Sequence, residues 1–266
     1  MDWIIDHQEA TGDWAGIWPP MAFGLLAYAL EGYSLESAPM RLGLEAIERF
    51  AWQDDAGKRI QACVSPVWDT ILMCVALSAT GFELHPRCSD PSILRRRGLA
   101  WLRQRQLFSS QGDWRVYRSR LTPGAFSFEN HNAWYPDVDD TAAAVIAFLR
   151  DDKWAVGSSH VLDAVQWILG MQCSNGGWAA FDVDNDKLFL NKIPFSDMDS
   201  LCDPATADIV GRVLEAFGLV LTAAFETRQH VDGPLSRVLD ELRKSCRRGI
   251  EFLQRSQEIN GAWYGR

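Results

Sequence analysis

Apolar residues recur every three or four positions along much of the chain, which is the spacing that lines one face of an α-helix. The pattern is clearest in six stretches, and it predicts helices over residues 21–30, 68–78, 141–150, 162–171, 209–225 and 235–254. Alternation of apolar and polar residues, the pattern of a half-buried strand, does not extend over any useful length. The chain is therefore predicted to be all-α, with almost no β structure.

A second pattern occurs four times among these helices: an apolar helix end, a glutamine and then Gly-x-Trp. The copies run from the Gln to the Trp over residues 8–14, 106–114, 172–178 and 257–263. Such self-similarity is typical of helical units that stack to bury a shared core, and each copy predicts a helix that ends at the glycine, followed by a turn. Core packing explains most of the tryptophans but not the recurring Gln and Gly. We therefore expect paired helices arranged as a barrel or solenoid.

Composition narrows the class of protein further. The 266 residues allow one large domain or two modest ones, and the net charge of −9 argues against a nucleic-acid partner, which needs a basic face. The longest apolar runs, 21–30 and 141–149, are shorter than the roughly 20 residues that span a bilayer. The first residues lack the basic segment of a signal peptide. Six cysteines without a Cys-x-x-Cys pair predict neither a zinc site nor a disulfide framework and favour an intracellular location.

Three aspartates lie within four residues, at Asp137, Asp139 and Asp140, and we call residues 137–140 the acid turn. Burial favours the protonated form of a carboxyl group, and a nearby cation favours loss of the proton. Three adjacent carboxyls therefore supply candidates for an acid, an anchor and a partner. A solvent-exposed acidic turn is the alternative. A calcium loop at 182–186 is disfavoured, because Lys187 stands where such a loop needs glycine.

Together these features resemble the terpene cyclase/mutase family, and most closely its squalene–hopene cyclases. The four repeats are similar to that family's QW repeats, and residues 135–142 look like its DxDDTA motif; the segments 61–70, 123–128 and 175–185 add support. The resemblance implies the α/α barrel, or α-toroid, of the class II terpene cyclases. It also implies an incomplete chain, in which residues 1–62 are terminal helices of the inserted barrel and residues 63–266 are part of the DxDD-bearing barrel.

The resemblance assigns roles to the polar residues of the acid turn and its surroundings. It makes Asp139 the proton donor, with Asp137 and Asp140 holding its environment. Arg212 stands where the family has a histidine that reloads the acid, and Asp208 matches a residue that supports this pair. Since arginine keeps its proton, it cannot relay one as histidine does, but it can stabilise the carboxylate left after donation.

The resemblance also implies a set of apolar substrate contacts, because aromatic faces stabilise a carbocation without quenching it. Three aromatic residues match cation-facing positions, one lies beside the acid turn, one replaces a glutamine of the family and one falls in the segment lining the entry channel. In that order they are Trp68, Phe128, Phe181, Trp134, Trp18 and Phe195. For any single aromatic side chain, ordinary core packing is an equal alternative.

The function implied is protonation-initiated polycyclisation of squalene or a related linear polyprene to a hopane-type product, without a metal or other cofactor. The resemblance further implies peripheral, monotopic association with a membrane or lipid droplet, and it leaves open a homodimer. Cation chemistry needs a closed, dry pocket. We therefore expect the isolated chain to be inactive.

Two other functions remain as alternatives. A class II diterpene cyclase also carries DxDD, but it needs basic side chains that bind a diphosphate. The flanking residues 65–68 favour the squalene type. No DDxxD motif is present for magnesium-assisted ionisation. The second alternative is a non-catalytic helical remnant that binds a lipid or a partner. Incubation with squalene and analysis of the products separates these alternatives.

Overall fold

The computed structural model describes residues 1–79, 90–109, 111–130, 132–193, 201–228 and 234–264. Within these ranges the chain is mainly helical. The helices are α1 (Asp2–Asp6), α2 (Trp18–Leu30), α3 (Ala38–Phe50), α4 (Pro66–Ala79), α5 (Pro91–Arg103), α6 (Val138–Asp151), α7 (Ser159–Gly170), α8 (Ala207–Glu226) and α9 (Pro234–Ser256). Short 3-10 helices cover Asp113–Val116, Lys153–Gly157 and Leu188–Lys192.

The six helices predicted from apolar periodicity are confirmed as α2, α4, α6, α7, α8 and α9. The expectation of almost no β structure is confirmed, since the named strands of the described ranges are β1 (Ala51–Asp54) and β2 (Gly57–Ile60), which form a two-stranded antiparallel hairpin. Its residues are half-buried or exposed on both faces, so they show no alternation to detect. Helix α3 was also missed, because Pro39 and Gly43 weaken a helical prediction.

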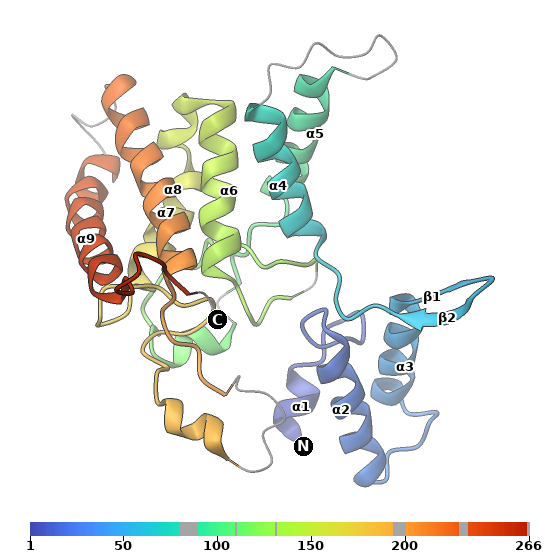
Figure 1. Ribbon diagram of the computed structural model, residues 1–266. Helices are drawn as coiled ribbons and strands as arrows, with labels where there is room; N and C mark the ends of the chain where they lie inside the picture. The colour runs from blue at the N-terminus through green and yellow to red at the C-terminus, as the bar shows by residue number, and fades with distance from the viewer. Residues whose placement is uncertain (80–89, 110, 131, 194–200, 229–233, 265–266) are drawn as a thin grey trace.

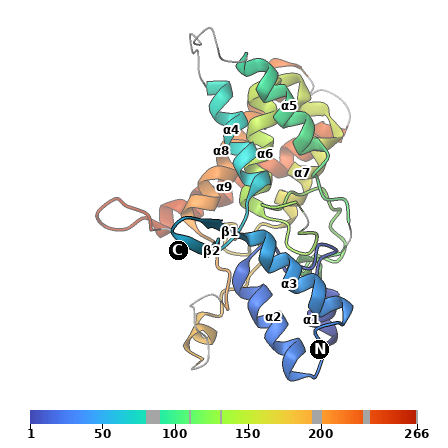
Figure 2. The same ribbon diagram turned by 90° about the vertical axis from the view of Figure 1, so that its right-hand side faces the viewer.

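The helices form two groups, each with its own hydrophobic core. Figure 1 shows α4–α9 side by side in one group and α1–α3 with the hairpin in the other; Figure 2 shows the smaller group against one end of the larger. The smaller core contains Trp14, Met21, Leu25, Tyr28, Met40, Ala46 and Phe50, whereas the larger one extends over α4–α9. We call these groups the N-terminal unit and the acid-bearing unit.

Helix α6 is the centre of the acid-bearing unit. Every residue from Asp140 to Leu149 is buried, and α6 packs against α4, α7 and α8. Alanines at 142–144 and 147 leave room for these neighbours to approach closely. The acid turn forms the start of this helix, so it is held by the most completely packed element of the chain.

Hydrogen bonds explain why glutamine and tryptophan recur together in the repeats. In three copies the Gln side-chain amide donates to the glycine carbonyl four residues later, over 2.8–2.9 Å. In the same copies the Trp indole donates to a carbonyl ten residues earlier, over 2.8–2.9 Å. Gln8 and Gln172 donate a second bond to backbone carbonyls of a helix further along the chain, Pro39 in α3 and Ser245 in α9. The repeat therefore links the end of one helix to another helix by hydrogen bonds from the glutamine side chain.

The second copy is built differently, which its longer Gln-to-Trp spacing foreshadows. Gln106 donates to Gly124 and His160, and Trp114 donates to the nearby Gln111 carbonyl. The expectation that each helix runs to the glycine is wrong, because α1, α5, α7 and α9 all end before the glutamine. The four glycines instead adopt positive φ angles of 86–130°, which favour residues without a Cβ.

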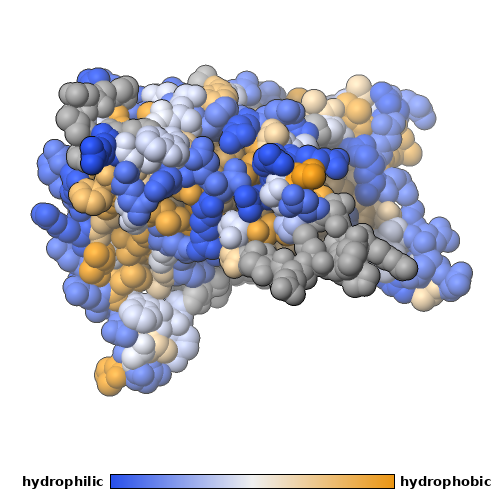
Figure 3. All heavy atoms as spheres, turned by 90° about the horizontal axis from the view of Figure 1, so that it is seen from above, coloured by the Kyte–Doolittle hydropathy of each residue, from blue (hydrophilic) through white to orange (hydrophobic). Residues whose placement is uncertain are grey.

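No described helix combines the length and the apolar character needed to cross a bilayer. Seen from above, hydrophilic side chains cover much of the visible face, with hydrophobic groups between them (Figure 3).

Candidate active site

The acid turn is shaped by Asp137, which caps the N-terminus of α6. Its Oδ1 accepts hydrogen bonds from the backbone N–H groups of Asp139 and Asp140, over 2.6 and 3.1 Å. These N–H groups would otherwise lack partners in the first helical turn. Burial raises the pKa of Asp137 despite these two bonds. Asp137 therefore fixes the backbone from which the other two carboxyl groups project.

Asp139 forms an ion pair with Arg212, which lies on α8. Arg212 Nε donates to Asp139 Oδ1 over 2.5 Å, and the guanidinium carbon lies 5.0 Å from the centre of the Trp68 ring. The predicted contact between Arg212 and the acid turn is confirmed. The geometry also gives Trp68 a partner, because the arginine covers one face of its indole. Acid, cation and aromatic ring thus come from α6, α8 and α4.

Burial and charge act in opposite directions on Asp139. Desolvation raises its pKa, Arg212 lowers it through charge and a hydrogen bond, and the like charge of Asp208 raises it; the net change is upward. Asp208 itself is exposed in the first turn of α8. Burial therefore favours the protonated form of Asp139, and Arg212 lies where it can stabilise the carboxylate that remains when the proton leaves.

Asp140 is the most isolated of the three carboxyl groups. It is buried, and its Oδ1 has no hydrogen-bond partner among the described residues. Burial is the main reason that the pKa of Asp140 is raised, and the nearby charges of Asp137 and Asp139 add to it. A neutral Asp140 avoids placing a second buried negative charge beside Asp139.

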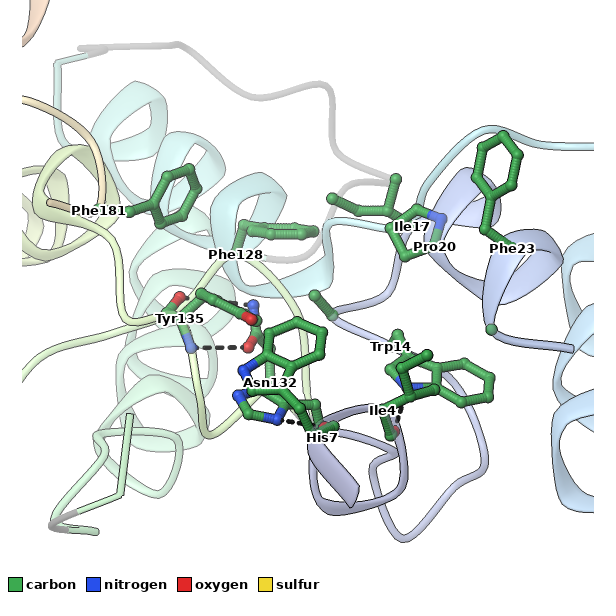
Figure 4. A pocket seen from close by; sticks show the side chains of 13 residues that line it. Ile4, His7, Trp14, Ile17, Pro20, Phe23, Phe128, Asn132, Tyr135 and Phe181 are labelled. Atoms are coloured by element: carbon green, nitrogen blue, oxygen red, sulfur yellow. Dashed lines mark hydrogen bonds between the residues drawn. The ribbon is translucent and has the colours of Figure 1, made fainter. Parts of the chain in front are cut away.

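An apolar cavity of about 410 Å³ lies between the two units. The residues of the acid turn, Arg212 and Trp68 are not among those that line it. Phe128, Tyr135 and Phe181 line it from the acid-bearing unit, while Ile17, Pro20 and Phe23 line it from the N-terminal unit; Figure 4 shows the two sets facing each other. This volume lies within the usual range of small-molecule sites. Two of the predicted cation-facing residues, Phe128 and Phe181, are therefore brought to one cavity.

Backbone contacts connect this cavity to the ion pair. The Phe128 carbonyl accepts hydrogen bonds from the N–H groups of Val67 and Trp68, over 3.1 and 3.3 Å, in the first turn of α4. Tyr135, on the cavity wall, is two residues before Asp137. The positions of Phe128, Trp68 and the acid turn thus depend on one another.

The structure places Trp134 and Trp18, two of the other predicted aromatic residues, away from the cavity wall. Trp134 stacks on the His7 ring, with centroids 3.9 Å apart, and it is not among the residues lining the cavity. Trp18 is 36% exposed at the start of α2 and also lies off the cavity wall. Phe195 lies outside the described residues. Core or surface packing therefore describes Trp134 and Trp18 better than contact with this cavity.

His7 is a cavity residue that the sequence did not indicate. Its ring lies between Trp3 and Trp134, with centroids 3.9 Å from each, and Nε2 is 3.2 Å from Asp113 Oδ1. It therefore joins α1 to the acid-bearing unit. Only its place beside a repeat glutamine marked it in the sequence.

No three His, Cys, Asp or Glu side chains in the described ranges are arranged to hold a metal ion.

Comparison with known proteins places these features in a family. The family model of the squalene–hopene cyclase C-terminal domain matches residues 64–266, and that of the N-terminal domain matches residues 1–56. A squalene hopane cyclase of Aspergillus fumigatus is 48% identical over the whole chain, which covers 38% of that protein. A terpene cyclase–glycosyl transferase fusion protein of Humicola fuscoatra is 47% identical, with 20% of it covered. The squalene–hopene cyclase of Alicyclobacillus acidocaldarius is 38% identical, with 39% of it covered. The chain thus spans about two fifths or less of these relatives.

Proposed function

The chain belongs to the squalene–hopene cyclase family, and on that premise we propose that it is the acid-bearing part of a triterpene cyclase. The proposed substrate is squalene or a related linear polyprene, and the proposed reaction is polycyclisation started by protonation, giving a hopane-type product. The observation that supports this most is the Asp139–Arg212 ion pair at the start of a buried helix, with the Trp68 ring against the arginine. An isolated acidic surface turn would have neither the cation nor the burial.

In the proposed first step, the protonated Asp139 carboxyl gives its proton to the terminal alkene of the substrate. The alkene π electrons form the new C–H bond, the O–H bond breaks, and a tertiary carbocation and the Asp139 carboxylate remain. Arg212 stabilises that carboxylate, so its charge acts in the transition state as the anion develops. The arginine thus strengthens the acid without giving up a proton of its own.

Reloading of Asp139 then needs a proton from another source. The buried Asp137 and Asp140 both have raised pKa values and lie on the same turn, so they keep protons near neutral conditions better than ordinary carboxyls do. The proton released when the final cation collapses to an alkene, or one from water, restores the balance. Replacement of the family histidine by Arg212 changes the reloading step and leaves the donor in place.

The cavity has the properties that carbocation chemistry requires. Phe128 and Phe181 present aromatic rings, which attract cations through their faces and do not react with them. The other wall is made mostly of apolar side chains from α1, α2 and the segment between them, which offer water few hydrogen-bond partners. Water exclusion matters because a single water molecule ends the cascade by capturing the cation.

Peripheral membrane association is part of the same proposal, since the substrate is a lipid. The 3-10 helix Leu188–Lys192 carries two exposed apolar side chains, with Leu188 at 40% and Phe189 at 67% exposure. Apolar side chains presented to solvent are the usual means by which a surface segment enters the lipid interface.

A graft tests the function. The 266-residue chain replaces the corresponding segment of the Alicyclobacillus squalene–hopene cyclase, and both the graft and the isolated chain are incubated with squalene in detergent. We expect pentacyclic products from the graft and none from the isolated chain, whose cavity is open to solvent. A folded graft that yields no cyclic product would favour the non-catalytic remnant, and catalytic turnover by the isolated chain would show that its pocket is already sufficient.

A further inference from the structure

A tight turn of backbone, residues 180–182, presents Phe181 to the cavity, and one carboxylate holds it. Asp203 Oδ2 accepts hydrogen bonds from the N–H groups of Phe181 and Asp182, over 2.6 and 2.8 Å. Its Oδ1 accepts from the N–H of Ala180 over 3.3 Å. Three consecutive backbone donors thus converge on one side chain, which lies more than 20 residues further along the chain.

The same turn is joined to the acid turn. The Ala180 carbonyl accepts a hydrogen bond from the N–H of Val138 over 2.8 Å, and Val138 is the first residue of α6. Asp203 is near enough to Asp137 for its charge to contribute to the raised pKa of that group. A shift of the 180–182 turn would therefore move Phe181 and disturb the start of α6 together.

Asp203 is itself held on both sides. Its N–H donates to the Asn185 carbonyl over 2.9 Å, so residues 185 and 203 form an isolated antiparallel bridge. Four residues later α8 begins, and this helix carries Arg212. Asp203 thus lies where the segment bearing Phe181 meets the segment that leads to the cation of the ion pair.

The chemistry of this contact requires a carboxylate. Two oxygens with several lone pairs can accept three N–H bonds, whereas an asparagine amide has one accepting oxygen and a nitrogen that only donates. Hydrogen bonds to a charged acceptor are also stronger than those between neutral groups. An amide at position 203 would therefore leave at least one of the three N–H groups facing another donor.

We propose that Asp203 is a positioning residue for the cyclisation cavity: it fixes the 180–182 turn so that the Phe181 ring faces the cationic reaction path. This inference rests on the proposed function for its chemical consequence. Its structural part, the holding of the turn by Asp203, stands on the hydrogen bonds alone. Nothing in the sequence motif itself points to Asp203, which is separated from the acid turn by more than 60 residues.

The structural part is tested by hydrogen exchange on the 266-residue chain. Asp203→Asn should speed exchange of the amides of residues 180–182 by at least about tenfold, because each loses an accepting carboxylate. Asp184→Asn is the matched control: Asp184 lies on the same loop, is exposed, and its side-chain Oδ1 accepts a hydrogen bond from the N–H of Ser174. Its φ of 58° also suits asparagine. Unchanged protection of the 180–182 amides in Asp203→Asn would overturn the proposal.

The positioning role is tested with a cationic probe, a trimethylammonium group carrying a farnesyl chain. Its binding is measured by the change in tryptophan fluorescence of the protein. Phe181→Leu removes the aromatic face, and Asp203→Asn is expected to weaken binding by roughly 3- to 10-fold. Combined, the two changes should weaken binding no more than Phe181→Leu alone, since Asp203 acts through that ring. Asp184→Asn should leave the affinity unchanged.

The outcomes separate the two proposals. If Asp203→Asn weakens probe binding equally in the unaltered chain and in the Phe181→Leu variant, Asp203 acts by another route. That result would overturn the inference. If the unaltered chain does not bind the probe, the proposed cavity function fails, and hydrogen exchange still decides whether Asp203 holds the turn. If Asp203→Asn does not fold, as judged by protection of α6 and α8, Asp203→Ser replaces it in both measurements.

Discussion

Two groups of carboxyl side chains have different surroundings, one at the start of α6 and the other where the two units meet. The acid turn carries Asp137, Asp139 and Asp140. The second group, which we call the joint carboxyls, consists of Glu9, Asp13 and Glu129; Asp13 and Glu129 are each only 5% exposed. Burial raises the pKa of Glu9 to about 7, with the charges of Glu129 and Asp13 adding to it. Glu9 therefore keeps a proton at pH values where an ordinary glutamate has lost it.

In the acid turn, one carboxyl group has a cationic side chain beside it. Asp139 is paired with Arg212, whereas Glu9 accepts a hydrogen bond from the Ala133 N–H and Asp13 accepts one from the Gly16 N–H. Burial alone makes a carboxyl a weaker acid, because it destabilises the anion that would form. A strong donor needs a protonated ground state and a stabilised anion at once. Asp139 and Arg212 combine these, so chemistry is expected at the acid turn, whereas pH-dependent stability is expected at Glu9.

The largest expected effect is on the acid itself. In the squalene–hopene cyclase graft, Asp139→Asn should lower product formation by at least about 100-fold, because an amide has no acidic proton to donate. Gas chromatography of the products measures this. Glu9→Gln is the matched change at the joint carboxyls and should keep the rate within about twofold. Activity of Asp139→Asn above one tenth of the unaltered graft would assign the proton to another group.

Removing the cation should have the next largest effect. Arg212→Gln is expected to slow cyclisation by roughly 10²-fold, since the carboxylate formed by Asp139 loses its charge partner. Arg212→His should recover much of the rate at pH 5.5 and lose it as the pH rises through about 6.5, where an imidazolium deprotonates. Rates measured from pH 5 to 8 test both variants. Equal pH profiles for the arginine and histidine forms would show that this charge is not used.

The helix cap gives a smaller effect, on stability. Asp137→Ala should lower the free energy of unfolding by about 1–2 kcal/mol, because the N–H groups of Asp139 and Asp140 lose their acceptor. Asp137→Asn keeps a capping oxygen and should cost less. Urea unfolding of the three forms gives the comparison. An equal loss in both variants would mean that the charge of Asp137 matters more than its capping bonds.

The smallest effect tests the joint carboxyls. The pKa of Glu9 in the folded chain, about 7, lies above its ordinary value of about 4.3, so the folded state binds the proton more tightly. The stabilisation linked to this proton is complete below pH 4, and it is lost as the pH rises through 7. Unaltered protein should therefore lose stability between pH 5.5 and 8.5 relative to Glu9→Gln.

Solvent screening of this half-buried group reduces the expected difference to roughly 1 kcal/mol, or about 2–4 °C in melting temperature. Melting curves of the unaltered chain and Glu9→Gln at both pH values provide the measurement. A pH-independent difference would contradict the raised pKa. The same curves for Asp139→Asn separate the two carboxyl groups, because at Asp139 the charge of Arg212 opposes the effect of burial on the pKa.

Local pattern was enough to predict six helices and the acid turn. Periodicity at three and four residues requires only that one helix face be buried, whatever it packs against. The Asp137 cap and the two carboxyls after it are likewise adjacent in the chain, so their proximity needed no tertiary information. The first, third and fourth repeats share the bond from the Gln amide to the glycine carbonyl, whereas in the second, with its longer spacing, the Gln106 amide bonds to Gly124 and His160.

The sequence by itself thus determined the helices, the repeated Gln–Gly–Trp units and the candidate acid, since these depend on residues close together in the chain. Arg212 was identified by a resemblance, but only the tertiary structure placed it between Asp139 and Trp68, on three different helices. Tertiary structure also decided that Trp18 lies off the cavity and that His7 lies on it. Contacts between distant segments depend on how whole helices pack, and a single local pattern is compatible with many such packings.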